Sequence, residues 1–458
     1  MSLLIVLRTT ILLLCLNIVF IGTSNGLSLP EKSSYTCVIG AGYSGLAVSR
    51  YLKQHGVNFT AFEAAREVGG AWRFDPHVGV DEDGVPVFTS QYKYLRVNTP
   101  RQTMEFDEFP FPSTTPTYPD GPCFYKYLKS FVKHFDLMTN IQVRSLVTSV
   151  TWAGDHWDLT YFRTEDHNNY TIPCDYVVIA NGQYVLPVVP MFPGLESFQG
   201  TICHSHDYKA PEPYTGRRVL LVGAGASGLD LTVQLHNITA KLVHSHHLKY
   251  TKPNYSERYV KKPDIQGFVE NGVVFKDGSF EEVDDVIFCT GYEYYHPFLD
   301  ESSGLTRSGK YVMPLYQHIV NMRRPTMTFI GVVNRVITKV MDAQAAYIAS
   351  LIAGKFELPS EQEMLDAWFD HAYRHKTAKE INTVGPEMDQ YFAKLSKEAG
   401  ITRNPPVLTH IRDFNAKNRL EDLFNYRDYD YEIIDSRSYK RWYNGGGKRG
   451  EECPIEAS

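Results

Sequence analysis

The chain has 458 residues, of which 43% are hydrophobic and 21% are charged, so it has room for two or three domains with a sizeable core. Its formal net charge is −6, and it has no dense block of Lys and Arg apart from the short KRGEE near its end. A nucleic-acid-binding protein carries a concentrated basic patch. The composition therefore argues against nucleic acid as a partner and predicts small-molecule partners.

The first 26 residues differ in kind from the rest of the chain. Arg8 precedes an apolar run over residues 11–21, and small residues at 22–26 offer a cleavage site. This pattern is typical of a secretory signal peptide, so we predict that residues 1–26 are removed and that the mature protein is secreted, with no stable membrane anchor. An uncleaved membrane anchor is the alternative, although the run is shorter than the ~18 apolar residues that a spanning helix needs.

Six cysteines follow the predicted signal peptide, and none of them forms a CxxC pair. An even number in a secreted chain permits disulfides, but spacing alone assigns no pairing. Cys37 and Cys289 lie in apolar runs typical of buried strands, so we expect a buried free thiol at each position.

Four Asn-x-Ser/Thr sequons predict a glycoprotein. They are at Asn58, Asn169, Asn237 and Asn254. Asn58 and Asn237 each fall in the turn between the helix and the second strand of a predicted βαβ unit, which is the edge opposite the nucleotide crevice. Glycans there would leave a cofactor site open.

The stretch from Tyr35 to Trp72 predicts a complete dinucleotide-binding βαβ unit. An apolar strand run leads into the motif Gly40-x-Gly42-x-x-Gly45, and a helical stretch from Ser44 to about His55 follows. The glycines allow a tight turn, close approach of the backbone to a pyrophosphate, and close packing of helix on strand.

The end of the second strand identifies the nucleotide. Glu63 can accept hydrogen bonds from both ribose hydroxyls, so the site favours an adenosine without a 2′-phosphate, in FAD or NAD. The further glycine pair Gly69-Gly70, followed by Trp72, lets the chain contact a longer cofactor. We therefore predict FAD here.

Residues 74–119 read as a long loop that lies over the cofactor. Within it, Asn98 is the candidate catalytic residue, because a neutral amide can donate a hydrogen bond to an oxygen species without supplying a proton. The alternative is an Asn that satisfies its own turn before Thr99-Pro100. The spacing over residues 121–135 predicts a helix whose aromatic side chains belong to the core.

Strands are expected over 141–152, 157–163 and 176–180, the first two as a hairpin with Asn169 near a polar turn. Prolines at 187, 190 and 193 mark a linker. Beyond it, His204 and Tyr208 have the spacing of one helical face, but the spacing alone defines no chemistry. His206 and the cluster His244-x-His246-His247 have no Cys or carboxylate at ligand spacing, so we predict no metal site.

A second glycine motif predicts a second nucleotide site. A strand ending at Val222 precedes Gly223, Gly225, Ser227 and Gly228, and a helix to about His236 and a strand to His244 follow. In place of an acid, the second strand is followed by Ser245, His246, His247 and Lys249.

Basic residues in place of a carboxylate indicate a 2′-phosphate, and hence NADPH. Because free imidazole has a pKa near 6.5, His246 and His247 would carry a partial charge at neutral pH. We therefore expect a modest preference for NADPH over NADH that strengthens on acidification.

The last third of the chain returns to the first domain. Apolar runs over 286–292 and from Met327 read as strands, and helices are expected over 342–354, 361–375 and 386–398. Gln344 begins the first of these helices, where its amide either faces the isoalloxazine or lies at the surface. A Tyr-rich polar tail follows, and its last ten or so residues are expected to be disordered.

With these motifs in order, residues 34–435 resemble the flavin-containing monooxygenases. The most specific signature is FxGxxxHxxxYK at 198–209, and EVGGAW, FPFP and FCTGY agree with the family pattern. The resemblance implies FAD on the first fold, NADPH on the second and O2 as cosubstrate. It also implies an active-site role for Asn98 and a cofactor-lining role for Gln344, while His246 and His247 replace the usual Arg at the NADPH phosphate.

The predicted signal peptide and the missing hydrophobic C-terminal anchor resemble the secreted insect branch of this family, which would place the protein in an extracellular fluid such as haemolymph. The resemblance implies transfer of one oxygen through a C4a-hydroperoxyflavin to a soft nucleophile. It favours the tertiary amine of a pyrrolizidine alkaloid such as senecionine as that nucleophile. A broad xenobiotic N- or S-monooxygenase and a non-enzymatic nucleotide-binding protein are the alternatives. A disulfide reductase would need a redox Cys pair, and an amine oxidase would lack the second glycine motif.

The predicted fold class is α/β, with two Rossmann-like domains, the second inserted in the first. The sequence leaves open whether the protein forms a homo-oligomer. The predicted boundaries are a signal peptide at 1–26, FAD-binding domain parts at 27–197 and 312–440, an NADPH-binding domain at 198–311 and a polar tail at 441–458.

Overall fold

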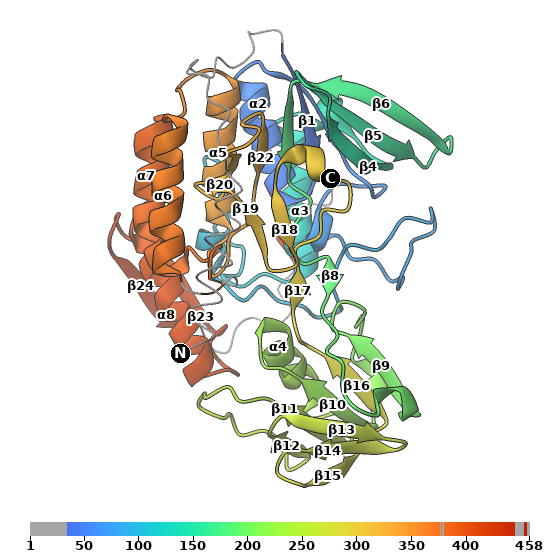
Figure 1. Ribbon diagram of the computed structural model, residues 1–458. Coiled ribbons are helices and arrows are strands. Elements are labelled where there is room, and N and C mark those ends of the chain that lie inside the picture. The colour runs from blue at the N-terminus through green and yellow to red at the C-terminus, as the bar shows by residue number, and fades with distance from the viewer. Residues whose placement is uncertain (1–33, 376, 378–379, 445–452, 456–458) are drawn as a thin grey trace. The chain divides into compact units, whose positions relative to one another are not determined.

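The fold is described from a computed structural model, which covers residues 34–375, 377, 380–444 and 453–455 (Figure 1). The predicted signal peptide lies outside these residues. Within the described ranges, no helix combines the length and apolar character needed to cross a bilayer.

The first glycine motif lies at the centre of a seven-stranded sheet with the order β20-β21-β22-β7-β1-β2-β3. Strands β22 to β3 are parallel, and β21 and β20 add an antiparallel edge. The inner strands are apolar and buried on both faces, as expected when a parallel sheet is covered on both sides. The strands are β1 (Tyr35–Ile39), β2 (Asn58–Phe62), β3 (Ile141–Gln142), β7 (Tyr176–Ile179), β20 (Leu315–Tyr316), β21 (Val320–Asn321) and β22 (Met327–Phe329).

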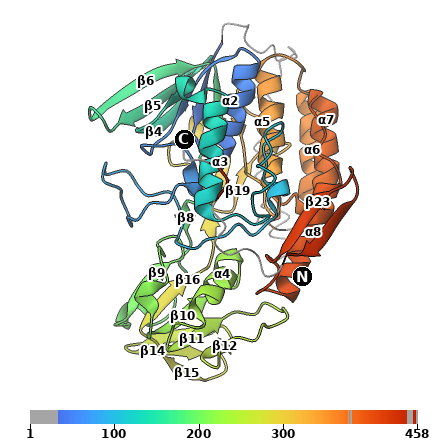
Figure 2. The same ribbon diagram turned by 180° about the vertical axis from the view of Figure 1, so that it is seen from behind.

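Helices cover one face of this sheet, and α2 and α5 lie side by side in both views (Figures 1 and 2). Helix α3 begins where the Asp120 carboxylate accepts a hydrogen bond from the Cys123 N–H, and Ser360 and Glu363 form a capping box at the start of α6. The helices are α2 (Tyr43–Gln54), α3 (Gly121–His134), α5 (Lys339–Ile352), α6 (Glu361–Arg374), α7 (Met388–Ala399) and α8 (Val407–Glu421).

A small antiparallel sheet packs against the main sheet through a core that includes Trp157, Leu159 and Val177. It comprises β4 (Ser145–Trp152), β5 (Trp157–Arg163) and β6 (Asn168–Cys174). The single strand predicted over 141–152 is wrong, because Arg144 has a φ of 54° and the chain leaves the main sheet there. The predicted hairpin has a third strand, β6, and Asn169 lies on it, two residues after the polar turn at 164–167, so its predicted place near a turn is confirmed.

The second glycine motif lies in a five-stranded parallel sheet with the order β12-β11-β10-β16-β9, beside α4 (Ala226–Leu235). All its strands come from residues 201–288, between the segments that supply the first sheet, so the predicted insertion of one Rossmann-like fold in another is confirmed. His204 ends β9, so it does not share a helical face with Tyr208. The strands are β9 (Thr201–His204), β10 (Arg218–Val222), β11 (Lys241–Ser245), β12 (Tyr259–Lys262) and β16 (Asp285–Phe288).

Shorter strand pairs complete the architecture. An antiparallel sheet, β13-β14-β15, adjoins the second fold, and β8 pairs with β17, β18 with β19 and β23 with β24. These strands are β8 (Leu186–Pro187), β13 (Ile265–Val269), β14 (Gly272–Phe275), β15 (Phe280–Glu282), β17 (Tyr292–Glu293), β18 (Thr306–Ser308), β19 (Tyr311–Met313), β23 (Tyr429–Ile433) and β24 (Tyr439–Tyr443).

Two cysteine expectations differ in outcome. Cys289 is a buried free thiol, as predicted, but Cys37 is disulfide-bonded to Cys174, 137 residues away at the end of β6. A second disulfide joins Cys123 on α3 to Cys453. Spacing gave no signal for either bond, because each depends on folding that brings distant segments together.

The C-terminal region is more ordered than the sequence suggested. Helix α8 was not predicted, and the supposed tail from residue 441 includes part of the β23–β24 hairpin. The Cys123–Cys453 disulfide fixes residues 453–455 against α3, so disorder is wrong for these three residues. The rest of the stretch predicted to be disordered lies outside the described residues.

Candidate active site

The turn after β1 is built so that only glycine fits. Gly40 has a φ of 101°, and a Cβ there would lie 2.7 Å from the carbonyl oxygen of Ala180. A Cβ on Gly45 would lie 1.8 Å from the carbonyl oxygen of Gly40, so α2 starts directly against the strand. No side chain caps α2 at Gly42, which leaves its first N–H groups for a phosphate.

The glycine pair of the GGxW motif lies against this turn. Gly69 donates its N–H to the carbonyl oxygen of Ala41 over 2.9 Å, and a Cβ on Gly42 would lie 3.3 Å from the Cα of Gly70. The Trp72 ring packs 4.1 Å from the ring of Phe124. The two glycine motifs thus form one backbone cradle that side chains would fill.

Glu63 lies at the tip of β2, only 7% exposed. Its two oxygens accept hydrogen bonds from the N–H groups of Ala41 and Ala65, at 2.8 and 2.9 Å. Burial raises its pKa, while these backbone hydrogen bonds oppose the shift. Each oxygen keeps a lone pair for a ribose hydroxyl, as the predicted role requires.

These residues line a cavity whose wall is largely apolar and aromatic. Gly40, Gly42, Glu63, Gly70 and Trp72 all line it. Among the described lining residues Glu63 is the only Asp, Glu, Lys, Arg or His, so the wall offers no acid-base pair. The other walls include Phe88, Tyr184, Val185, Tyr295, Phe298, Gly331 and Met341.

FAD fits this arrangement, because the glycine cradle, the unpaired N–H groups of α2 and Glu63 match its pyrophosphate and ribose. When bound, FAD supplies the redox chemistry that these side chains do not.

Gln344 is neither at the surface nor among the residues that line the cavity. It is fully buried in α5, where its Oε1 accepts a hydrogen bond from the Gly331 N–H at 2.9 Å and its Nε2 donates to the Tyr391 hydroxyl at 2.8 Å. Gly331 does line the cavity. Gln344 therefore positions the wall through the backbone of Gly331, and direct contact with the cofactor stays a prediction.

Asn98 is held through its backbone. Its carbonyl oxygen accepts a hydrogen bond of 2.8 Å from the Asn415 side chain on α8, and Arg427 donates to the neighbouring carbonyl of Val97. The Asn98 side chain is not among the groups lining the cavity. Its catalytic role stays a prediction.

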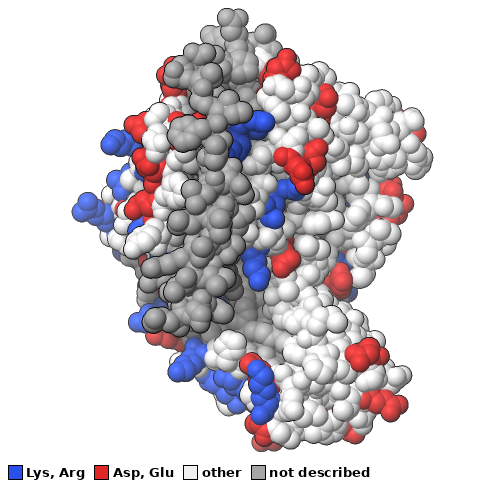
Figure 3. All heavy atoms as spheres, viewed as in Figure 1, with Lys and Arg blue, Asp and Glu red and all other residues white. Residues whose placement is uncertain are grey.

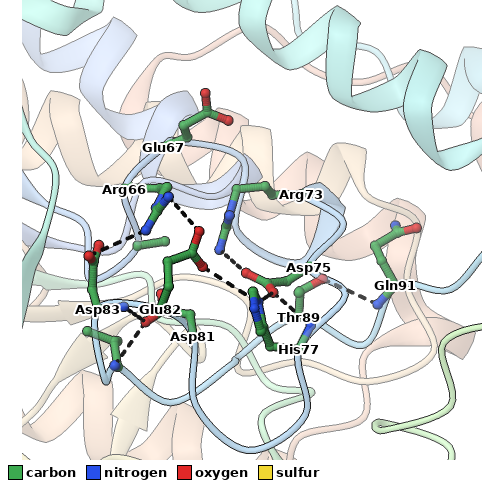
Figure 4. A network of polar contacts seen from close by, with 12 residues as sticks. Arg66, Glu67, Arg73, Asp75, His77, Asp81, Glu82, Asp83, Thr89 and Gln91 are labelled. Atoms are coloured by element: carbon green, nitrogen blue, oxygen red, sulfur yellow. Dashed lines mark hydrogen bonds and ion pairs between the residues drawn. The ribbon is translucent and has the colours of Figure 1, made fainter.

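The loop after Trp72 is fixed by a network of ion pairs and hydrogen bonds (Figure 4). The buried Asp75 carboxylate binds Arg73 and His77, at 2.8 Å each, and Arg66 binds Glu82. Although burial opposes it, hydrogen bonding from His77 lowers the pKa of Asp75. The network holds the loop that begins beside the glycine cradle, and Phe88 of this loop lines the cavity. Its position over a bound cofactor stays a prediction.

The second glycine motif has the same local geometry. Gly223 has a φ of 97°, and a Cβ on Gly228 would lie 2.0 Å from the Gly223 carbonyl oxygen. Gly223, Gly225, Ser245 and His246 line a second cavity, whereas Ser227 is half-buried at the start of α4 and is not among its lining residues. Ser245 is engaged as a donor to the carbonyl oxygen of Pro263.

The charge expected at His246 is absent. Its ring is buried, which lowers its pKa to about 3, so it stays neutral at physiological pH. His247 is the other imidazole at this edge, and its ring is exposed. The sequence reasoning missed Lys276 and Asp264, which line the same cavity and pair over 3.2 Å.

The two nucleotide folds are joined by a buried polar cluster that the sequence did not indicate. Asp230 on α4 accepts hydrogen bonds from the Tyr92 hydroxyl at 2.7 Å and from Arg427 at 2.8 Å. In the FxGxxxHxxxYK motif, the carbonyl oxygen of Lys209 accepts a hydrogen bond from the Lys93 N–H, and the Tyr208 hydroxyl donates to the side-chain oxygen of Gln234. The motif therefore attaches the loop of residues 74–119, here called the cofactor loop, to the second fold.

Comparison with known proteins agrees with this site. The family model "Flavin-binding monooxygenase-like" matches residues 33–249 and 257–413. Senecionine N-oxygenase of Tyria jacobaeae is 48% identical, over 94% of this chain and 96% of the relative, and the trimethylamine monooxygenase of Methylocella silvestris is 31% identical, over 87% and 92%. The structure of S-allyl-L-cysteine S-oxygenase from Allium sativum aligns with a TM-score of 0.79 at 26% identity, over 86% of this chain and 95% of the other.

The chain belongs to the flavin-binding monooxygenase-like family. It is a flavin-dependent monooxygenase, with FAD and NADPH as its cofactors. The predicted family, fold class and cofactors are confirmed.

Proposed function

We propose that this protein uses FAD, NADPH and O2 to N-oxygenate plant alkaloids with a tertiary amine, pyrrolizidine alkaloids such as senecionine among them. The observation that carries the proposal is the 48% identity to senecionine N-oxygenase across nearly the whole of both chains. The trimethylamine monooxygenases are only 27 to 31% identical.

The first cavity supports an uncharged, soft substrate. Tyr184, Tyr295 and Phe298 line it, and Glu63 is the only Asp, Glu, Lys, Arg or His among its described lining residues. Such a wall excludes water and accepts an apolar ring system around a neutral amine. The side chains bind and orient the substrate, while the oxidising power comes from the bound cofactor.

The test is turnover by the purified holoenzyme with NADPH and air, using senecionine, trimethylamine and a simple thioether in parallel. The proposal predicts the N-oxide of senecionine as the product formed with the highest kcat/KM. Comparable kcat/KM values for all three would indicate a broad N- and S-monooxygenase and would overturn the alkaloid assignment.

We also propose that the protein is a secreted glycoprotein. Two disulfides support an oxidising compartment, and the four sequon asparagines Asn58, Asn169, Asn237 and Asn254 are all exposed. Expression in insect cells should give mature protein in the medium that lacks residues 1–26 and loses mass on treatment with an N-glycosidase. Retention in the cell membrane with an intact N-terminus would contradict secretion.

A further inference from the structure

A second group of ligand-type side chains lies away from both nucleotide cavities, at the C-terminal end of α6. His371 and His375 are four residues apart, and Glu387 comes from the short 3-10 helix Gly385–Glu387 before α7. One ligand atom from each residue lies within 4.8 Å of the others. His371 lies in the last turn of α6, and His375 is the extended residue that follows the helix, so the group forms where the chain leaves α6.

Each of the two histidines has a ring nitrogen that is available to bind a metal. His371 donates from Nε2 to the carbonyl oxygen of Ile381 over 2.7 Å, which fixes the tautomer and leaves the lone pair of Nδ1 available. Histidine ligands of metals commonly donate their other ring N–H to a carbonyl in this way. Nε2 of His375 is buried and has no hydrogen-bond partner among the residues that the structure describes.

One oxygen of the Glu387 carboxylate is also available to a metal. Arg374 binds the other oxygen, Oε1, and this leaves Oε2 as a ligand. His371 and Glu387 line a cavity with Tyr316, Trp368 and Tyr391, so an ion has a path to the site.

We propose that His371, His375 and Glu387 bind a divalent transition metal of the zinc class, with the remaining coordination position facing the cavity. Two imidazoles and one carboxylate form a ligand set that suits Zn²⁺ and does not suit Mg²⁺ or Ca²⁺, which take oxygen ligands. This site is distinct from the redox centre.

The other described triplet of this kind does not offer the same chemistry. Asp75, His77 and Glu82 also place ligand atoms within 4.8 Å of one another. It has one imidazole instead of two, and both of its carboxylates have cationic partners, Arg73 for Asp75 and Arg66 for Glu82 (Figure 4). Because the His77 ring is itself paired with the Asp75 carboxylate, His77 provides a control.

A metal here would connect α6 to the elements that hold the cofactor wall. Glu387 directly precedes α7, on which Tyr391 donates to the carbonyl oxygen of Gln317 and accepts a hydrogen bond from Gln344. Gln344 in turn holds Gly331. Binding to the folded state alone stabilises it, so Zn²⁺ should raise the unfolding temperature.

The test is calorimetric titration of the tag-free, chelator-treated holoenzyme with Zn²⁺. We expect about one equivalent to bind per chain and to raise the unfolding temperature. His371→Ala and His375→Ala should each weaken binding by about tenfold or more. His77→Ala should leave it unchanged, and His375→Cys, which keeps a zinc-binding side chain, should restore most of the affinity and show that loss of folding is not the cause.

Absence of Zn²⁺ binding by the wild type would overturn the proposal. Equal binding by the double variant H371A/H375A, or loss of binding in His77→Ala alone, would overturn it as well.

Discussion

Coenzyme choice depends on individual charges at the edge of the second cavity. Lys276 and His247 line this cavity, and both pair with the carboxylate of Asp264, at 3.2 and 3.4 Å. A 2′-phosphate bound here would be repelled by this carboxylate and would compete with it for both side chains. We therefore expect Asp264 to limit the preference for NADPH over NADH.

Asp264→Asn should raise the ratio of kcat/KM for NADPH to that for NADH by about threefold, the effect expected of an exposed charge pair. Lys276→Ala should lower the same ratio. Because the buried His246 stays neutral, steady-state kinetics with both coenzymes should show at most a weak increase of the ratio between pH 8 and pH 6. An unchanged ratio in both variants would exclude this edge as the phosphate site.

Asn98 is suited to a test of its side chain alone. Its backbone is held by Asn415 and its neighbour Val97 by Arg427, so Asn98→Ala should fold and retain FAD. Loss of the amide should increase the hydrogen peroxide released per NADPH oxidised and reduce N-oxide formation. Full coupling of NADPH oxidation to product in this variant would refute the catalytic role.

At the scale of elements, Arg427 connects segments that are far apart in the sequence. It lies 13% exposed in an ion pair with Asp230 on α4, and it also donates to the carbonyl oxygens of Arg96 and Val97 in the cofactor loop. Removing one partner of a buried pair leaves an uncompensated charge.

Arg427→Ala should lower the free energy of unfolding by about 3 to 5 kcal/mol. It should also loosen the loop that carries Asn98, so KM for NADPH should rise. Arg437→Ala, at an exposed turn between β23 and β24, is the control and should change neither value. If denaturant unfolding gave the same midpoint for both variants, the structural role of this pair would be refuted.

The elements that carry local sequence signals could be predicted, and those that depend on distant contacts could not. Both glycine motifs and Glu63 follow from a βαβ unit of consecutive residues. Helix α8 was missed because its apolar periodicity is interrupted by buried Asn415 and Asn418. The disulfides, Asp264 with Lys276 and Asp230 with Arg427 join residues 12 to 330 positions apart, and no spacing rule identifies such partners.

At the scale of the whole molecule, buried neutral histidines make stability sensitive to acid. Burial lowers the pKa of several imidazoles below the ordinary value, to about 4 for His204, His244 and His296 and to about 3 for His246 and His318. The unfolded chain takes up these protons near pH 6.5, while the folded chain does so only at lower pH. Stability is therefore complete above pH 6.5 and is lost as the pH falls toward 4.

The unfolding temperature of the holoenzyme should fall steadily between about pH 6.5 and pH 4, each histidine contributing up to about 1.4 kcal/mol per pH unit. His296→Phe, which removes one such group from an aromatic environment beside Phe329, should flatten this dependence. Calorimetry across this pH range gives the slope, and an identical slope in the variant would show that His296 does not titrate as described.

On the face shown in Figure 3, acidic and basic side chains of the described residues are interspersed. The described part of this face therefore has no concentrated field of one sign that would steer a polyanion.

The central claim is that one fold holds FAD permanently while the other receives NADPH as an exchanging electron donor. The most direct measurement is the absorption spectrum of the gently purified protein, before and after one equivalent of NADPH is added without oxygen. The account predicts about one flavin per chain and rapid bleaching of the oxidised flavin bands. A colourless protein that stays colourless when FAD is supplied would contradict the account.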